Sequence, residues 1–157
     1  MTERFIEWAR AHKWEIKTSP EPVPLPGHIV KRYGIPEKWY AFISKFTVCE
    51  DADAFRWFLT PNDYQPREDG CQWNGYKWNE FELQSLEWCG DDPDIISFWD
   101  KHLPIVYSVD GECSYYAIDT ESGKVVKGYE PEYEEADAVA DNFEDFIEKI
   151  ISGEIML

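Results

Sequence analysis

The sequence predicts an α+β fold, in which helices at the N- and C-terminal ends flank a central, mostly antiparallel sheet. Two apolar runs rich in β-branched and aromatic residues, 105–109 and 113–119, are joined by the turn dipeptide Asp110-Gly111. Helical periodicities occur towards both ends of the chain, and strand-like runs lie between them. A length of 157 residues suits one domain, so we expect residues 1–157 to form a single domain.

The N-terminal region is expected to hold one helix and a proline-rich connection. Residues 3–14 place Phe5, Trp8 and His12 at helical spacing, with charged residues between them. Residues 19–27 contain four prolines, which are excluded from a helix interior and from a central strand. This segment is therefore predicted to be an irregular connection.

The next region is expected to form a second helix followed by two strands. After one helical turn at 28–33, Pro36 suits the first turn of a helix over 37–46, because its fixed φ fits that position. The runs 47–49 and 55–60 have the apolar, β-branched and aromatic composition of short strands. The helix residues expected to be buried are Trp39, Phe42, Ile43 and Phe46.

Two further helices are expected after an irregular middle segment. Residues 61–75 are rich in Pro, Asp, Asn and Gly, which is typical of irregular structure. Asn79 and Glu82 have the spacing of a capping box and predict a helix over 79–88. Residues 93–102 are expected to form a short helix with three apolar side chains facing inward. These side chains are Ile95, Ile96 and Trp99.

The central hairpin carries a specific prediction of register. A two-residue loop places Val109 opposite Glu112 and Tyr107 opposite Ser114. A second turn leads to a third strand over 124–129. Neither face of these strands is uniformly polar, so both faces of the sheet are expected to be partly covered.

The C-terminal region is expected to form an acidic loop at 130–137 and then an amphipathic helix. Asn142 is a suitable N-cap, and Gly153 is a suitable residue to end the helix. Apolar residues recur between them at i, i+3, i+4, i+7 and i+8, the spacing of a buried helix face. They are Phe143, Phe146, Ile147, Ile150 and Ile151.

The formal net charge of −17 lies almost entirely in the second half of the chain. Residues 1–80 carry 12 acidic and 11 basic residues, whereas residues 81–157 carry 20 acidic and 4 basic residues. Such a surface repels nucleic acid and anionic membranes and attracts basic partners. On charge alone, a solvated surface that aids solubility is the stronger interpretation.

The sequence contains no motif that assigns a catalytic, cofactor or metal site. It lacks a phosphate-binding glycine loop, a zinc-protease helix motif and a nucleophile elbow. His12, His28 and His102 are far apart in the chain, and a nucleophilic pair of Cys113 with His102 is disfavoured. Carboxylates are abundant enough to lie close together by chance. We therefore expect no enzymatic activity, no cofactor and no bound metal.

The cysteine pattern and the first residues favour a cytoplasmic protein. The four cysteines are widely separated, without a C-x-x-C motif, which indicates neither a zinc site nor a disulfide framework. The first twenty residues are charged throughout and lack the apolar core of a signal peptide. No apolar run has the length of a membrane span.

The order of these elements resembles that of the SUKH superfamily, named in part for a fungal cell-wall assembly regulator. Its members carry a strand reaching a Gly/Asp turn, a YYxxD-like strand, a strand after a glycine turn and a final capped helix. The corresponding positions here are Asp110-Gly111, Tyr115 to Asp119, Gly123 to Val126 and Asn142 to Phe146. The match covers residues 98–152, about a third of the chain, and segment 61–78 has no counterpart in it.

The resemblance implies a non-enzymatic domain that binds other proteins. Many bacterial members are immunity proteins that neutralise toxins, and many of those toxins are nucleases. The expected partner is therefore a protein, a basic toxin domain, and the family shares no catalytic residues. Two other classes stay open, namely a regulatory or scaffold domain with an unrelated partner and an enzyme with an unrecognised carboxylate site.

Turns and strand ends in the acidic half supply the candidate contacts for such a partner, because these positions expose side chains without disturbing a core. The candidates are Asp110, Glu112, Asp119, Glu121, Glu130, Glu132, Glu134 and Glu135. An aromatic patch around Trp73, Tyr76 and Trp78 is the alternative interface.

Overall fold

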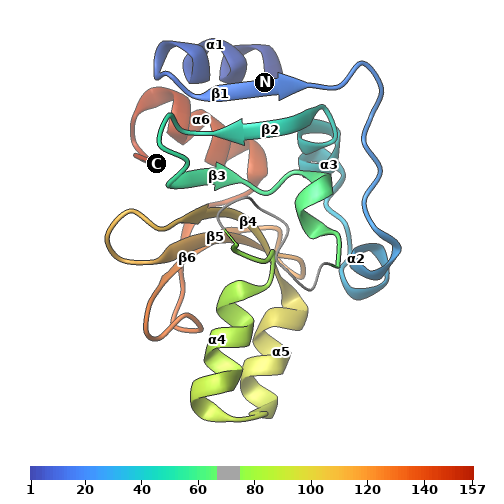
Figure 1. The fold of residues 1–157 in the computed structure, drawn as a ribbon, viewed down its shortest axis with the longest axis vertical. Coiled ribbons are helices and arrows are strands. Elements are labelled where there is room, and N and C mark those ends of the chain that lie inside the picture. The colour runs from blue at the N-terminus through green and yellow to red at the C-terminus, as the bar shows by residue number, and fades with distance from the viewer. Residues whose placement is uncertain (67–74) are drawn as a thin grey trace.

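The computed structural model describes residues 1–66 and 75–157 and confirms the α+β prediction (Figure 1). Within these residues, seven strands form one antiparallel sheet in which each strand pairs with the next along the chain. The strands are β1 (Glu15–Thr18), β2 (Phe46–Glu50), β3 (Arg56–Phe58), β4 (His102–Ser108), β5 (Ser114–Asp119), β6 (Val125–Tyr129) and β7 (Asp137–Ala140). The helices are α1 (Thr2–Ala11), α2 (Gly27–Arg32), α3 (Glu37–Ile43), α4 (Glu80–Cys89), α5 (Pro93–Lys101) and α6 (Phe143–Ser152), with the short 3-10 helix η1 (Pro61–Tyr64).

One face of the sheet, here called the first face, packs against α1, α3 and α6. Phe58 on β3 lies 5.2 Å from Phe5 and 6.0 Å from Phe42, measured between ring centroids. On β5, the ring of Tyr116 lies 5.0 Å from that of Phe146 on α6. This face therefore buries an aromatic cluster contributed by both ends of the chain.

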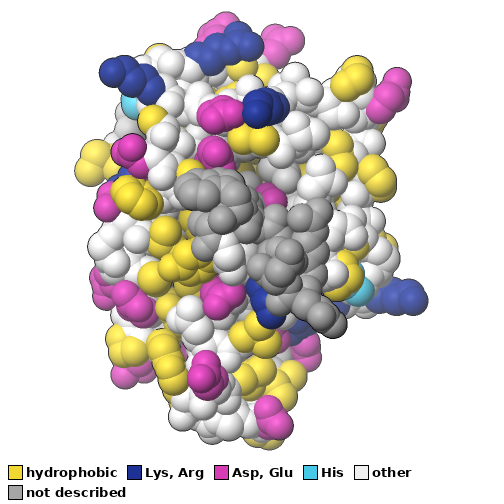
Figure 2. Space-filling model, viewed as in Figure 1, with side chains coloured by type: hydrophobic (Ala, Val, Ile, Leu, Met, Phe, Trp, Pro, Cys, Tyr) yellow, Lys and Arg dark blue, Asp and Glu magenta, His cyan; other side chains and the backbone are white. Residues whose placement is uncertain are grey.

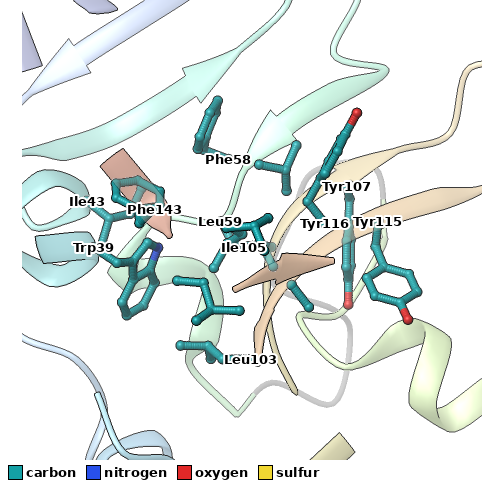
Figure 3. Close-up of a cluster of buried hydrophobic side chains, with 14 of the residues drawn as sticks. Trp39, Ile43, Phe58, Leu59, Leu103, Ile105, Tyr107, Tyr115, Tyr116 and Phe143 are labelled. Carbon is teal, nitrogen blue, oxygen red and sulfur yellow. The ribbon is translucent and has the colours of Figure 1, made fainter. Parts of the chain in front are cut away.

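The opposite face, here called the second face, packs against α4 and α5, which extend away from the rest of the molecule in Figure 1. The ring centroid of Phe81 lies 4.5 Å from that of Tyr107, and Trp99 lies 4.9 Å from Tyr115. Figure 3 shows Tyr107 and Tyr115 directed to one side of the strands and Tyr116 to the other. Both faces are covered, as the apolar composition of the strands predicts.

The central hairpin is confirmed, but the predicted register and two-residue loop are wrong. Tyr107 pairs with Tyr115 and Ser108 with Ser114, so the loop spans residues 109–113. Further along, the register shifts between Pro104 and Val106. Because directly paired residues share a face of the sheet, the pairing of Tyr107 with Tyr115 instead of Ser114 places both tyrosines on the second face.

Contacts with neighbouring elements explain the longer loop. Asp110 forms an ion pair with Arg56 on β3, and the amide of Cys113 donates to the carboxylate of Glu130 (2.9 Å). The residues around the turn are therefore bonded to neighbouring segments instead of to each other. Gly111 still has the positive φ, +75°, for which glycine suits the turn.

Two strands and one helix boundary differ from the sequence prediction. β1 and β7 were not predicted, because both are short, largely exposed edge strands without an apolar alternation. The first helix ends at Ala11 instead of residue 14, because Lys13 adopts a left-handed φ of +62° and the chain reverses into β1.

The capping box predicted at the start of α4 is wrong, although the helix itself is confirmed. Asn79 occupies the N-cap position without a side-chain capping bond, and the carboxylate of Glu82 binds Arg32 on α2. Instead, the amide of Lys77 donates to the carboxylate of Glu80 (3.0 Å). A charged partner from another element therefore outcompetes the local capping bond.

The end of helix α3 and one expected core position also differ. α3 ends at Ile43, and Phe46 is buried as the first residue of β2. Ile96 is 38% exposed, because Ile95 and Trp99 share the face of α5 turned to the sheet and Ile96 lies to one side of it.

Helix α6 is confirmed in detail. The side chain of Asn142 accepts a hydrogen bond from the amide of Asp145 (2.9 Å), and Gly153 ends the helix in the left-handed conformation. The four residues buried on this helix are Phe143, Phe146, Ile147 and Ile150. The amphipathic spacing read from the sequence therefore identifies the docked face correctly.

Candidate functional site

The structure brings six of the eight candidate carboxylates to one end of the sheet. β5 and β6 pair from Ser114 with Tyr129, so the β4–β5 and β6–β7 loops emerge beside each other. The amide of Glu130 donates to the carbonyl of Cys113 (2.9 Å) and joins the two loops. We call the following residues the acidic end: Asp110, Glu112, Glu130, Glu132, Glu134 and Glu135.

Three carboxylates of the acidic end have structural partners. Besides the ion pair of Asp110 and the loop contact of Glu130, the carboxylate of Glu134 accepts a hydrogen bond from the indole of Trp99 on α5 (2.9 Å). The other three, Glu112, Glu132 and Glu135, are exposed and have no ion pair or side-chain hydrogen bond with the described residues. Acidic side chains are visible along the edge of the molecule on which these loops lie (Figure 2). Three carboxylates are thus available to a partner without breaking internal contacts.

The β6–β7 loop is anchored against α4 by Tyr133, which is buried. Its ring stacks on Phe81 with 4.6 Å between centroids, and its hydroxyl donates to the side-chain oxygen of Gln84 (3.0 Å). The loop passes close to β6 at Gly128, where a Cβ atom would lie 2.6 Å from the carbonyl oxygen of Tyr133. This close approach requires glycine at that position.

Trp88, which stands beside the acidic end, is not among the site residues predicted from the sequence. Phe81, Gln84 and Trp88 share one face of α4, and Tyr133 lies along that face. The rings of Trp88 and Tyr133 stack at 6.2 Å with an interplanar angle of 12°, yet Trp88 is 55% exposed. No sequence signal identified this place, because it depends on how the acidic loop folds onto α4.

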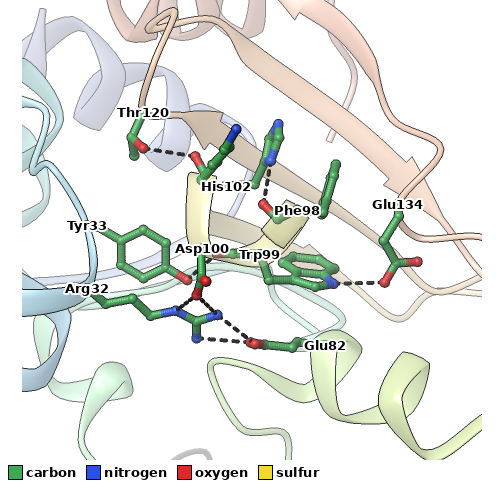
Figure 4. Close-up of polar contacts among 10 residues, drawn as sticks. Arg32, Tyr33, Glu82, Phe98, Trp99, Asp100, His102, Thr120 and Glu134 are labelled. Carbon is green, nitrogen blue, oxygen red and sulfur yellow. Dashed lines mark hydrogen bonds and ion pairs between the residues drawn. The ribbon is translucent and has the colours of Figure 1, made fainter. Parts of the chain in front are cut away.

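A polar cluster at the base of α4 and α5 holds these helices against α2 (Figure 4). The guanidinium of Arg32 donates to both carboxylate oxygens of Glu82 (3.0 and 2.6 Å) and to Asp100 (3.0 Å). The hydroxyl of Tyr33 donates to the carbonyl of Trp99 (2.8 Å). Burial lowers the pKa of Arg32, but the bond to Glu82 and the nearby charges raise it above its usual value. The cluster therefore links three helices through a charged arginine.

The two remaining candidates, Asp119 and Glu121, lie at the opposite end of the hairpin. Asp119 accepts hydrogen bonds from the amide of Glu121 (3.0 Å) and the hydroxyl of Ser122 (2.7 Å), and Glu121 pairs with Lys101 (3.4 Å). Burial raises the pKa of Asp119, but these bonds and the nearby His102 lower it below its usual value. Asp119 therefore stabilises a turn away from the acidic end.

Replacing Asp119 with alanine is expected to lower the free energy of unfolding by about 1 kcal/mol at pH 7, because the turn loses its acceptor. A depressed native pKa stabilises the fold above the unfolded carboxyl pKa of about 3.9, and this contribution is lost as the pH falls through the native pKa. The difference from wild type should therefore shrink at pH 3. Urea denaturation at both pH values tests this, with Asp91→Ala, an exposed aspartate, as control. A difference of equal size at pH 3 would contradict it.

The alternative aromatic interface does not form an exposed patch within the described residues. Trp78 is 7% exposed and packs beside Tyr64, with 5.9 Å between ring centroids. Tyr76 is half-buried and packs against Trp57 (5.8 Å). Trp73 lies outside the described residues.

The structure does not bring the candidate nucleophile pair together. His102 begins β4, whereas Cys113 lies beyond the other end of that strand, next to the pair formed by Ser108 and Ser114. In residues 1–66 and 75–157, no group of three or more His, Cys, Asp or Glu side chains is arranged to hold a metal ion. None of the helices in the same residues has the length and apolar character needed to cross a bilayer.

Comparisons with protein-family models, with curated proteins and with solved structures find no match.

Proposed function

We propose that this protein is a non-enzymatic binding domain that captures a basic protein on its acidic end. The observation that carries the proposal is the exposed Trp88, which stands beside a loop whose carboxylates at Glu132 and Glu135 have no ion pair or side-chain hydrogen bond with the described residues. Exposed aromatic side chains are frequent anchors of protein interfaces, and surrounding charges steer the encounter. Arginine or lysine side chains of a partner would stack on the indole and meet the carboxylates.

Immunity towards a toxin is the specific role that we propose. Its support is the resemblance of residues 98–152 to the SUKH superfamily, of which we propose this chain to be a member. The basic groove with which a nuclease holds phosphates would be attracted to the acidic end and blocked by it. The described cysteines, Cys49, Cys89 and Cys113, are free thiols, which fits the cytoplasmic location that we propose.

Association kinetics test the proposal, with a partner recovered by pull-down from the source cell and identified by mass spectrometry. We expect a Glu112/Glu132/Glu135→Gln variant to associate more slowly at low salt, on the order of tenfold, with little change in its dissociation rate. The difference should narrow at physiological salt, where the screening length is about 8 Å. A Glu3/Glu7/Glu21→Gln variant makes the same charge change at exposed residues outside the acidic end and is the matched control.

Trp88→Ala tests, in the same assay, whether the indole slows dissociation while the carboxylates speed association. It should accelerate dissociation by more than tenfold, whereas Leu83→Ala, at a 40% exposed position on another side of α4, should not. If the association rate did not depend on salt, and all variants bound the partner with wild-type rates, the acidic end would be only a solvated surface. A partner bound elsewhere would then favour the regulatory or scaffold class.

A further inference from the structure

A hollow of about 460 Å³ lies on the first face of the sheet, across β3 to β6. Two adjacent rows of paired residues form its floor. The first row consists of Arg56, Ser108, Ser114 and Tyr129, one residue from each strand. The second row contributes Val106, Tyr116 and Lys127. The hollow exists because serine occupies the two central positions of the first row, where larger side chains would fill the space.

The two cations of the hollow differ in their partners. Arg56 donates to Asp51 (3.0 Å) and pairs with Asp110, so two carboxylates offset its charge. The ammonium nitrogen of Lys127 lies 5.0 Å from the ring centroids of both Tyr116 and Tyr129. Among the described residues, it has no carboxylate within 4.0 Å. A half-buried positive charge between two aromatic walls therefore faces the hollow.

The charge around Lys127 narrows the class of ligand. A cation would be repelled by Lys127, whose charge is not offset by an ion pair with the described residues. A neutral apolar molecule would cover the ammonium without supplying a counter-charge, which is unfavourable. A polyanion would bring several negative charges past Asp110 and Glu112 on the wall of a protein with a net charge of −17. A molecule with one negative charge pairs with Lys127 and meets less repulsion from Asp110 and Glu112 than a polyanion.

We propose that this hollow binds a small organic acid with a flat apolar body. The carboxylate of the ligand pairs with Lys127, and the body lies over Ser108 and Ser114 against the rings of Tyr116 and Tyr129. The hydroxyls of Ser108 and Ser114 supply hydrogen bonds on the floor. The volume falls within the range of about 300–1,000 Å³ typical of small-molecule sites.

The site shares Asp110 and Glu112 with the acidic end, but it lies on the face of the sheet opposite to Trp88. Trp88 belongs to α4, which packs on the second face, whereas the hollow opens on the first face. A loss of acid binding therefore leaves the proposal for the acidic end standing, and the reverse also holds.

The test compares 2-naphthoate with its uncharged analogue 2-naphthamide by isothermal titration calorimetry. The wild type should bind the acid at least tenfold more tightly than the amide. Lys127→Met should remove this preference and Lys127→Arg should retain it. Lys124→Met, a change at an exposed lysine without an ion pair in the described residues, should bind like wild type.

A second variant tests the place of binding. Ser108→Phe fills the floor of the hollow and should abolish binding of naphthoate, while the near-UV circular dichroism stays native. The proposal would be overturned if the wild type bound the acid and the amide equally, or bound neither up to millimolar concentration. Unchanged binding of naphthoate by Lys127→Met, or by natively folded Ser108→Phe, would also overturn it.

Discussion

Phe146→Ala is expected to lower the free energy of unfolding by about 3–5 kcal/mol. Phe146 is fully buried on α6, and its ring lies 5.0 Å from that of Tyr116 and 6.3 Å from that of Phe143. Alanine has the higher helix propensity, so the loss arises from packing and not from the helix itself. The cavity would open between α6 and the first face of the sheet, where the two ends of the chain meet.

Equilibrium denaturation in urea measures this loss as a lower transition midpoint. Met156→Ala is the control, because its side chain is 84% exposed and its removal should change stability by less than about 0.5 kcal/mol. Equal midpoints for wild type and Phe146→Ala would show that α6 is not docked on the sheet.

Arg32→Ala is expected to cost about 3 kcal/mol, because it leaves the carboxylate of Glu82 buried without its charged partner. Glu82 is 7% exposed, and Arg32 supplies two hydrogen bonds to it and one to Asp100. The α4–α5 pair would lose its attachment to α2. Thermal and urea denaturation at pH 7 measure the effect.

The ion pair of Arg4 with Glu148 is a matched control. Its nitrogen and oxygen are separated by 2.6 Å, as in the Arg32–Glu82 pair, but its side chains are 59% and 46% exposed. Arg4→Ala should therefore change stability by less than about 1 kcal/mol.

The double variant Arg32→Met/Glu82→Leu removes both charges and should recover most of the stability lost in Arg32→Ala. Equal losses in Arg32→Ala and Arg4→Ala would contradict the role assigned to burial.

The sequence correctly predicted the elements whose formation depends on residues close together in the chain. α6 combines a capping residue, a regular apolar stripe and a terminal glycine, and all three act within ten or so residues. The turn between β4 and β5 was likewise predicted from Asp110-Gly111. The edge strands β1 and β7 lack such determinants, because they exist through pairing with β2 and β6 and have few buried side chains.

The candidate site was likewise predicted only in part. Its carboxylates were identified from charge and from their places at turns. The sequence did not show which of these carboxylates are available to a partner protein. Glu130 accepts a hydrogen bond from Cys113 and Glu134 accepts one from Trp99, and both donors are distant in sequence. Trp88 lies within the helix predicted over 79–88, where no local signal distinguishes it as an interface residue. It became a candidate anchor only when Tyr133 brought the β6–β7 loop onto α4.

The amino-acid sequence was enough to predict the fold class, the docked face of α6, the place of the turn between β4 and β5 and the concentration of negative charge in the second half. These properties follow from neighbouring residues or from composition. Tertiary structure alone decided the register of β4 on β5, the partners of Arg32 and Glu82, and the hollow around Lys127. Each depends on contacts between segments far apart in the chain, and a one-residue change in register would have turned Tyr116 and Lys127 to the other face of the sheet.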